Sequence, residues 1–562
     1  MDWAAAVSRI GFRAPEAAQS NLARLEERLP AVAASLPTLL AESPDPDAAL
    51  NLLERLTGTP DNHELLRKLE RSRFLVHYAI AVFGYSQWLG ETLIQNPDLF
   101  ARLARDRTLD RSHSREDFLE HFARFRSRSF ETDMGQLLAR FKKREYIRIM
   151  LRDVLGIAPL AETTAEISAL SDVLIEEAAR HVDTSLRNRY GSPRNVDHEG
   201  RVVDTPLSVL SMGKLGGNEL NYSSDVDLLF VYGDGDPDPP GEITNREYFI
   251  RLAQQVTEVL SRVSREGPVF RIDLRLRPQG AEGEPAVPLG HAIHYYAELA
   301  RDWELQALIK VRHSAGDQEL AREFIRAVQP FVYREELNFL AIETAVNSLE
   351  KIGAHRRKHM TARQAEGIDV KLDRGGIRDI EFLVQCLQRV YGGSETWLRS
   401  GGTLFSLQKL HDKGHISGKD YHELSQGYLF LRTIEHRLQL RRGQQVHRLP
   451  AAESDLSVLY RSAAGEEARD RSTEAFLAQL RGSMAAVADI YDRIIHNQQA
   501  QGRQEHESGE FRLAPPEAGR ENSYQQILQR LAADAPALYE VAAQRDLTTH
   551  TRRNLQRFLS AA

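Results

Sequence analysis

The chain is predicted to fold as a mostly helical α+β protein with a small strand-bearing region embedded among helices. Three observations predict this class. Apolar residues recur at helical spacing over most of residues 2–190 and again after about residue 316. Between these stretches, residues 206–212 (PLSVLSM) and 225–232 (DVDLLFVY) are short apolar runs typical of buried strands. Residues 269–280 (VFRIDLRLRPQG) alternate apolar and polar side chains, which is the strongest strand signal in the chain.

Taken in order along the chain, the remaining elements are predicted to be helices and one linker. Residues 74–94 are apolar enough to form one buried helix, and residues 112–189 and 246–263 also have the helical pattern. Residues 498–523 are rich in Gly, Pro and Glu and are predicted to be a linker or long loop. These breaks predict four regions: helical residues 1–110, strand-bearing residues 111–318 with a helical preface, helical residues 319–500, and residues 501–562, a linker with the start of another helical region.

Composition excludes several classes of function. The 562 residues include 73 basic and 80 acidic side chains, so a net charge of −7 gives no electrostatic footprint for nucleic acid. The single cysteine, Cys386, excludes an intramolecular disulfide and a cysteine-based zinc or iron–sulfur site. No apolar stretch reaches the roughly 18 residues of a transmembrane helix, and the N-terminus lacks the apolar core of a signal peptide. We therefore expect a cytoplasmic protein with no membrane partner and no nucleic-acid partner.

The segment from residue 211 to residue 232 carries the clearest chemical signal. A turn containing Gly213, Gly216 and Gly217 precedes Asp225 and Asp227, which stand two residues apart at the start of an apolar run. Side chains two apart on a strand point to the same face, so both carboxylates are expected to face one site. Mg²⁺ prefers one or two carboxylates together with phosphate oxygens. This pattern therefore favours nucleotidyl transfer.

The alternating strand adds a third carboxylate, Asp273, on a face shared with arginines. Three close carboxylates repel one another unless cations compensate, and Mg²⁺ would do so while aligning phosphates. Arg275 and Arg277 are candidates for bidentate phosphate contacts. The alternative readings are a solvated strand end for the aspartates, an ordinary tight turn for the glycines, and an exposed sheet face for the arginines. The three features together favour a nucleotidyltransferase.

The order of glycine pair, paired-aspartate strand and third-aspartate strand resembles the DNA polymerase β-type nucleotidyltransferase superfamily. Four blocks resemble, more closely, the glutamine synthetase adenylyltransferase/adenylyl-removing enzymes. They are residues 213–230 (GKLGGNELNYSSDVDLLF), 301–312 (RDWELQALIKVR), 375–385 (GGIRDIEFLVQ) and 431–450 (LRTIEHRLQLRRGQQVHRLP). The resemblance extends over roughly residues 74–450. It implies a small mixed β-sheet in a nucleotidyltransferase domain flanked by helices and followed by a helical bundle.

The resemblance also implies a reaction. Proteins of this family carry two catalytic halves, of which the N-terminal half removes AMP and the C-terminal half attaches it. This chain contains one copy of the glycine–aspartate block, so we expect a single half from a truncated or split gene. The spelling ELNYSSD, Arg378 and the long helical N-terminus resemble the adenylyl-removing half. The alternatives are forward adenylyl transfer from ATP, a non-catalytic regulatory half, and a nucleic-acid polymerase of the same superfamily.

The site residues follow from the motifs. Asp225, Asp227 and Asp273 are expected to be catalytic and to ligate Mg²⁺. The expected nucleotide- and phosphate-binding residues are Gly213, Lys214, Gly216, Gly217, Ser224, Arg275, Arg277, Lys310 and Arg312. A solvated lysine is the alternative reading for Lys214, and the basic end of an amphipathic element is the alternative for Lys310 and Arg312. The implied partners are glutamine synthetase as protein substrate, the PII signalling protein, ADP or ATP, and phosphate.

Overall fold

A computed structural model of the chain describes residues 2–59, 63–101, 103, 109–196, 199–234, 236–237, 243–333, 367–464 and 472–510. The chain divides into two compact units, Met1–His496 and Asn497–Ala562. The site and its surroundings belong to the first unit. No helix in the described part of the chain is both long and apolar enough to cross a membrane.

Short helices form the N-terminal part of the first unit, and their apolar faces belong to one large core cluster. Residues 74–94 do not form the single helix that their composition predicts. The backbone is extended at Ser86 (φ −139°, ψ 105°), whose hydroxyl accepts from the Leu89 amide at 3.1 Å and so starts a new helix. The helices are α1 (Trp3–Ile10), α2 (Pro15–Arg28), α3 (Pro30–Ala33), α4 (Leu36–Ala41), α5 (Pro46–Gly58), α6 (His63–Arg71), α7 (Arg73–Tyr85), α8 (Gln87–Gln95) and α9 (Asp98–Ala101).

Three longer helices lead to the strand-bearing region, as the pattern over residues 112–189 predicts. Ser114 begins the first with a capping box, in which its hydroxyl accepts from the Asp117 amide and Asp117 accepts from the Ser114 amide. The helices are α10 (Arg115–Arg126), α11 (Met134–Val154) and α12 (Leu160–Tyr190).

The central sheet is small and mixed, as expected. Its strand order is β6-β4-β3-β8, and β7 also pairs with β4. The β4 strand runs antiparallel to β3 but parallel to both β6 and β7, while β3 and β8 are antiparallel. The strands are β3 (Leu207–Ser211), β4 (Asp225–Tyr232), β6 (Arg271–Asp273), β7 (Ala286–Pro288) and β8 (Arg312–Gly316); β1 (Arg194–Val196), β2 (Val202–Asp204) and β5 (Asp236–Pro237) form a separate sheet.

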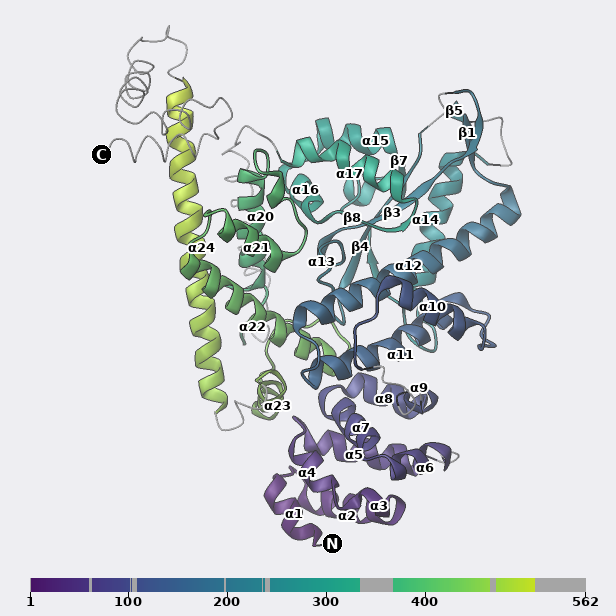
Figure 1. Ribbon diagram of the computed structural model, residues 1–562, viewed down its shortest axis with the longest axis vertical. Helices are drawn as coiled ribbons and strands as arrows, with labels where there is room; N and C mark the ends of the chain where they lie inside the picture. The colour runs from purple at the N-terminus through teal and green to yellow at the C-terminus, as the bar shows by residue number, and fades with distance from the viewer. Residues whose placement is uncertain are drawn as a thin grey trace, which may run out of the picture. The chain divides into compact units, whose positions relative to one another are not determined.

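Helices cover both faces of the central sheet (Figure 1). Alternate residues of β4 belong to two different core clusters, as the period of a strand requires. Val226, Leu228 and Phe230 lie in the core shared with α12 and α14 (Asn245–Ser261). Leu229 and Val231 lie in the core shared with α15 (Leu289–His294) and α17 (Gln318–Val332). The burial on both faces explains why this strand is so apolar.

The strand predicted over residues 269–280 is much shorter in the structure. Only Arg271–Asp273 forms β6, because the carboxylate of Asp273 accepts from the Arg275 amide at 2.8 Å and turns the chain. The guanidinium of Arg277 then stabilises the turn by donating to the carbonyls of Leu274 (2.7 Å) and Gly283 (2.9 Å). The alternation of Leu274 and Leu276 with arginines therefore belongs to a folded turn.

Further short elements connect the sheet to the helical part of the chain. Helices α20–α24 there enclose a separate core cluster that contains the buried Cys386. This arrangement confirms the expected helical bundle after the sheet. The connecting elements are η1 (Gly280–Glu282), η2 (Tyr295–Leu299), α16 (Asp302–Ala307) and η3 (Leu308–Lys310); the later ones are α20 (Ile377–Tyr391), η4 (Thr396–Leu398), α21 (Thr403–Asp412), α22 (Gly418–Arg442), α23 (Glu453–Ala463) and α24 (Thr473–Glu510).

The linker predicted over residues 498–523 is partly wrong. Residues 498–510 continue α24 as helix. Residues 511–523 lie outside the described residues.

Candidate active site

The predicted aspartates lie on two adjacent parallel strands. In the register of β4 and β6, Asp225 is opposite Arg271 and Asp227 is opposite Asp273. Asp225 and Asp227 alternate with Val226 and Leu228, whose side chains enter the core on the opposite face of the sheet. The structure therefore places Asp225 and Asp227 on one face of the sheet, with Asp273 beside Asp227.

The environment of the three carboxylates differs from one to the next. Burial, together with the charges of Asp273 and Asp225, raises the pKa of Asp227 to about 7. Hydrogen bonds from Arg275 hold the pKa of Asp273 below its usual range. Asp225 accepts from Arg271 Nε at 2.7 Å. Arginines thus pair with Asp225 and Asp273, whereas Asp227 has its pKa raised by burial and by these two neighbours.

The glycine turn packs directly against these carboxylates. It forms the short helix α13 (Gly213–Gly216), and the Met212 amide donates to the Asp227 carbonyl at 3.0 Å. Gly213 has φ +57°, and a Cβ at this position would lie 2.3 Å from Asp227 Oδ2. Only glycine can therefore bring the backbone this close to Asp227.

The glycine pair, Gly216 and Gly217, packs against other parts of the backbone. A Cβ at Gly216 would lie 1.8 Å from the carbonyl oxygen of Lys310, and one at Gly217 would lie 2.9 Å from the carbonyl of Gly401. The glycine pair thus allows close packing of α13 against η3 and the start of α21. Their expected role in phosphate binding stays a prediction.

The basic residues of the predicted site are paired with acids. Lys214 Nζ donates to both oxygens of Glu435 at 2.9 and 2.7 Å. Lys310 Nζ lies 3.0 Å from Glu219 Oε2. Burial lowers the pKa of Lys310, but the charges of Glu219 and Glu381 outweigh burial and raise it. Arg312 forms a bidentate pair with Asp172 at 2.7 and 3.1 Å. The structure therefore ties these residues into the framework around the aspartates.

Sequence reasoning missed Glu435, which pairs with Lys214, and the neighbouring Arg432, both on α22. Glu381, in the family block on α20, lies 3.7 Å from Lys310 Nζ. Arg432 donates to the Glu219 carbonyl at 2.8 Å and to Asn221 Oδ1 at 2.6 Å. Lys214 and Arg432 hold the pKa of the buried Glu435 carboxyl well below its usual range. The signal available in the sequence was the position of Glu435, Arg432 and Glu381 inside the blocks 375–385 and 431–450, which carry the family resemblance.

Ser224 lies between the glycine turn and Asp225, at the edge of a second feature. It lines a cavity together with Lys142, Tyr146, Phe270 and Arg271. Arg271 lines this cavity and also donates to Asp225. The cavity therefore opens beside the first carboxylate of the site.

The three aspartates are suited to a hard cation. Their oxygens are the ligands that Mg²⁺ prefers. Burial and the charges of Asp273 and Asp225 raise the pKa of Asp227, and a bound cation would offset the repulsion between these charges. In the described part of the chain, the one group of three residues whose ligand atoms all lie within 4.8 Å is a different one, His113, His121 and Glu145. Asp225 and Asp273 each accept hydrogen bonds from an arginine, Arg271 and Arg275.

The His113 group is poorly suited to a metal. Glu145 accepts from Arg144 Nη2 at 2.5 Å and lies 3.4 Å from Arg148 Nε, so two guanidinium groups already compensate its charge. Burial and Arg148 lower the pKa of His113 to about 3. The arginines would repel a cation, and the group is best explained as a buried polar network.

Two family models match the chain. Residues 76–327 match glutamate-ammonia ligase adenylyltransferase, and residues 347–495 match GlnD PII-uridylyltransferase. Similar curated proteins share the description bifunctional glutamine synthetase adenylyltransferase/adenylyl-removing enzyme. That of Thioalkalivibrio sulfidiphilus is 38% identical over 378 residues, covering 67% of this chain and 38% of the relative. That of Nitrosomonas europaea is 36% identical over 388 residues, covering 68% of this chain and 41% of the relative. The chain thus spans about two fifths of the length of these relatives.

Proposed function

The chain belongs to the family of glutamine synthetase adenylyltransferase/adenylyl-removing enzymes, and we propose that its aspartate site removes AMP from an adenylylated tyrosine of glutamine synthetase. The reaction is phosphorolysis, with ADP and unmodified synthetase as products. The observation that carries the proposal is the pairing of Asp227 with Asp273 on adjacent strands, directly under the Gly213 turn.

In the proposed reaction, a hydrogenphosphate oxygen attacks the α-phosphorus in line with the tyrosyl oxygen. A new P–O bond forms, the bond to the tyrosyl oxygen breaks, and the hydrogenphosphate proton ends on the tyrosine. Phosphate is already ionised, so the site mainly has to orient the reactants and balance their charge. Arg275, whose side chain is 77% exposed, is the cation best able to reach a phosphate oxygen.

Asp225, Asp227 and Asp273 would hold Mg²⁺ in this site. When bound, the ion supplies charge neutralisation and alignment of phosphate oxygens. The protein supplies the oxygen ligands and excludes bulk water from Asp227, whose raised pKa reports that partial burial. The backbone of the Gly213 turn approaches the Asp227 carboxylate closely, and we propose that its amides donate to a bound phosphate.

The direction of transfer is proposed from motif spelling. The ELNYSSD and GGIRDIEF segments resemble those of the adenylyl-removing half. In the opposite direction, Asp273 would accept the proton of a tyrosine hydroxyl during AMP transfer from ATP. A purely regulatory half is disfavoured, because a perturbed carboxylate such as Asp227 in a group of acids is typical of catalytic sites.

The proposal extends to partners and location. We place the reaction in the cytoplasm, with nucleotide and phosphate as small ligands and the PII signalling protein as a regulator. The match of residues 347–495 to a family named for PII uridylylation supports a contact with PII.

The test uses glutamine synthetase that carries labelled AMP, incubated with the purified chain, Mg²⁺ and phosphate. Labelled ADP that appears only when phosphate is present supports the proposal. An Asp225→Asn variant should release none, while Asp98→Asn, a change at a 65% exposed carboxylate, should match wild type. Labelling of unmodified synthetase from ATP, without release in the first assay, would overturn the direction. If the chain neither releases labelled ADP nor labels the synthetase from ATP, the proposal that it is catalytic is overturned.

A further inference from the structure

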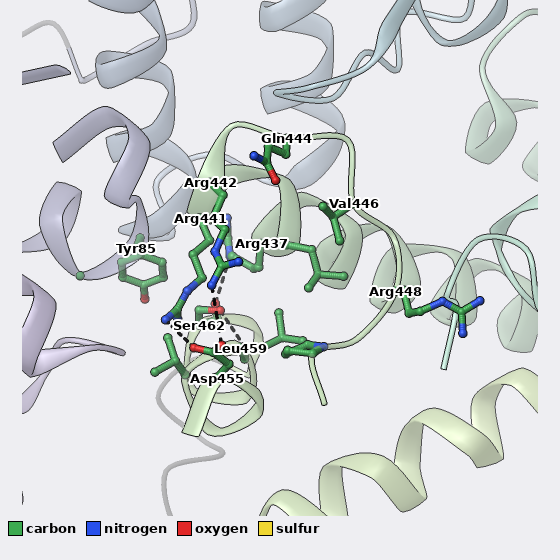
Figure 2. A pocket seen from close by; sticks show the side chains of 14 residues that line it. Tyr85, Arg437, Arg441, Arg442, Gln444, Val446, Arg448, Asp455, Leu459 and Ser462 are labelled. Carbon is green, nitrogen blue, oxygen red and sulfur yellow. Dashed lines mark hydrogen bonds and ion pairs between the residues drawn. The ribbon is translucent and has the colours of Figure 1, made fainter. Parts of the chain in front are cut away.

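A cavity of about 190 Å³ lies where the end of α22 meets α7 and α23, separate from the aspartate site. Figure 2 shows Arg437, Arg441 and Arg442 gathered on one side of it, near Asp455 and Ser462 of α23. Val446, Leu459 and Tyr85 add an apolar wall. The cavity therefore joins a cationic end to an apolar body.

The cationic end carries more positive than negative charge. Arg437 is neutralised by Asp153, at 2.6 and 2.9 Å. Arg441 and Arg442 both face Asp455, at 3.0 and 3.8 Å. Arg441 also reaches Asp45, at 3.3 Å, but Asp45 is shared with Arg13 at 2.6 Å. Two guanidinium groups thus face one carboxylate and part of another.

One N–H donor in this arginine cluster has no acceptor among the described residues. Arg441 Nη1 is buried from solvent and has no hydrogen-bond partner among the described residues. Among the residues that line this cavity, Arg441 Nη1 is the one buried side-chain polar atom without a partner. An N–H group left in this state favours an incoming acceptor. A planar guanidinium with a spare N–H is suited to an oxyanion.

We propose that this cavity binds a small oxyanion ligand, a carboxylate or phosphate group on a short apolar body. The head group would pair with Arg441 and Arg442, and the body would lie against Val446 and Leu459. The volume is below the roughly 300 Å³ at which drug-sized ligands begin, so the ligand is limited to a few non-hydrogen atoms.

The cavity also connects to the aspartate site through three residues, Gly443, Ser223 and Arg271. Gly443 follows Arg442, and its carbonyl accepts from Ser223 Oγ at 3.1 Å. Ser223 Oγ also accepts from Arg271 Nη1 at 3.3 Å, and Arg271 holds Asp225. A ligand that fixes Arg442 therefore fixes the segment that positions Ser223 and Arg271. The consequence for turnover, a change in the rate of ADP release on binding, rests on the proposed function.

The experiment is isothermal titration calorimetry of the full chain with butyrate, with inorganic phosphate, and with butyramide as the uncharged match of butyrate. We expect one or both anions to bind, butyramide not to bind, and Arg442→Gln to weaken binding at least about tenfold. Arg441→Lys, which keeps the charge but loses the guanidinium geometry, should also weaken it. Arg442 is 60% exposed and its change should leave the fold intact. Arg481→Gln, at an exposed arginine of α24, is the matched control.

The outcomes separate this proposal from the proposed function. Butyrate binding that depends on Arg442 identifies an organic acid, and phosphate binding with the same dependence identifies the inorganic ion. If phosphate binds the wild-type chain and Arg442→Gln equally, it is bound outside the cavity. If, in addition, butyrate does not bind the wild-type chain, the cavity proposal is overturned. Asp225→Asn should retain Arg442-dependent binding, so a failure of ADP release with binding intact overturns only the reaction.

Discussion

Lys214 Nζ lies 2.7 Å from Glu435 Oε2, and this ion pair joins the glycine turn beside the aspartates to α22 of the helical bundle. Both side chains are almost fully buried, at 11% and 1% exposure. Arg432 lies 3.4 Å from the same carboxylate, so Glu435 compensates two cations at once. The glycine turn beside the aspartates is thus held by a residue more than two hundred positions away in the chain.

Removing the shared carboxylate should destabilise the protein strongly. Glu435→Ala leaves Lys214 and Arg432 buried without their acid, and breaking such a pair costs about 3–5 kcal/mol. Urea unfolding followed by circular dichroism measures the change. Glu64→Ala, which removes a 70% exposed partner of Lys68, should cost less than about 1 kcal/mol. A loss at Glu435 no larger than that at Glu64 would show that the buried pair is not structural.

Substitution of Gly213 should separate backbone strain from the effect on Asp227. Gly213→Ala forces a side chain into a left-handed backbone and to within 2.3 Å of Asp227 Oδ2, so the carboxylate must move. Gly156→Ala has the same strain, at φ +69°, with nothing within 4 Å of the new Cβ. Both variants should lose about 1–2 kcal/mol of stability. Only Gly213→Ala should lose ADP release, by roughly 10²-fold or more for a displaced catalytic group. Equal activity in the two variants would contradict the contact.

The burial of His436 predicts a pH dependence of stability. Its Nε2–H donates to Asn221 Oδ1 at 2.7 Å, and burial, with the charge of Arg432, lowers its pKa to about 3. The unfolded chain binds a proton at this position below about pH 6.5, whereas the folded chain does not until about pH 3. Stability should therefore fall as pH drops from 6.5, by about 2 kcal/mol at pH 5 from this residue.

His436→Gln tests this dependence because glutamine can keep the N–H donor to Asn221 but cannot titrate. The difference in unfolding midpoint between pH 7 and pH 5 should shrink in the variant. Since other groups also titrate, the comparison is the difference between the two proteins at each pH. A parallel decline of both would mean that His436 does not contribute.

The strands and the glycine–aspartate segment were predictable because local pattern determines them. The apolar runs at residues 206–212 and 225–232 correspond to β3 and β4 within one residue. The two-residue spacing of Asp225 and Asp227 places them on one face because β4 is regular there. By contrast, the length of β6 depends on a hydrogen bond from the Arg275 backbone amide to the Asp273 carboxylate, which alternation does not reveal.

The partners of the basic residues could not be predicted, because they depend on tertiary contacts. Lys214 and Lys310 belong to the segments that pattern assigned to nucleotide binding, but their ammonium groups contact Glu435 and Glu219. The residue that holds Lys214 is separated from it by 221 positions, and no spacing rule spans that distance. The break between α7 and α8 at Ser86 could not be predicted either, because the flanking residues are apolar enough to form one continuous helix.

The crowding at Asp227 predicts how the protein should respond to Mg²⁺. Its pKa of about 7 arises from burial and from Asp273 and Asp225, so above pH 7 the folded chain gains a negative charge at Asp227 beside two other carboxyl groups. A bound cation relieves that repulsion in the folded state alone. At pH 8 and a free Mg²⁺ concentration about tenfold above the dissociation constant, the stability gain should be about 1.4 kcal/mol, seen as a raised Tm that a chelator reverses. Asp227→Asn removes the central ligand and should abolish the shift, whereas Asp98→Asn should keep it. An identical shift in wild type and Asp227→Asn would place the cation elsewhere and remove these aspartates from the metal site.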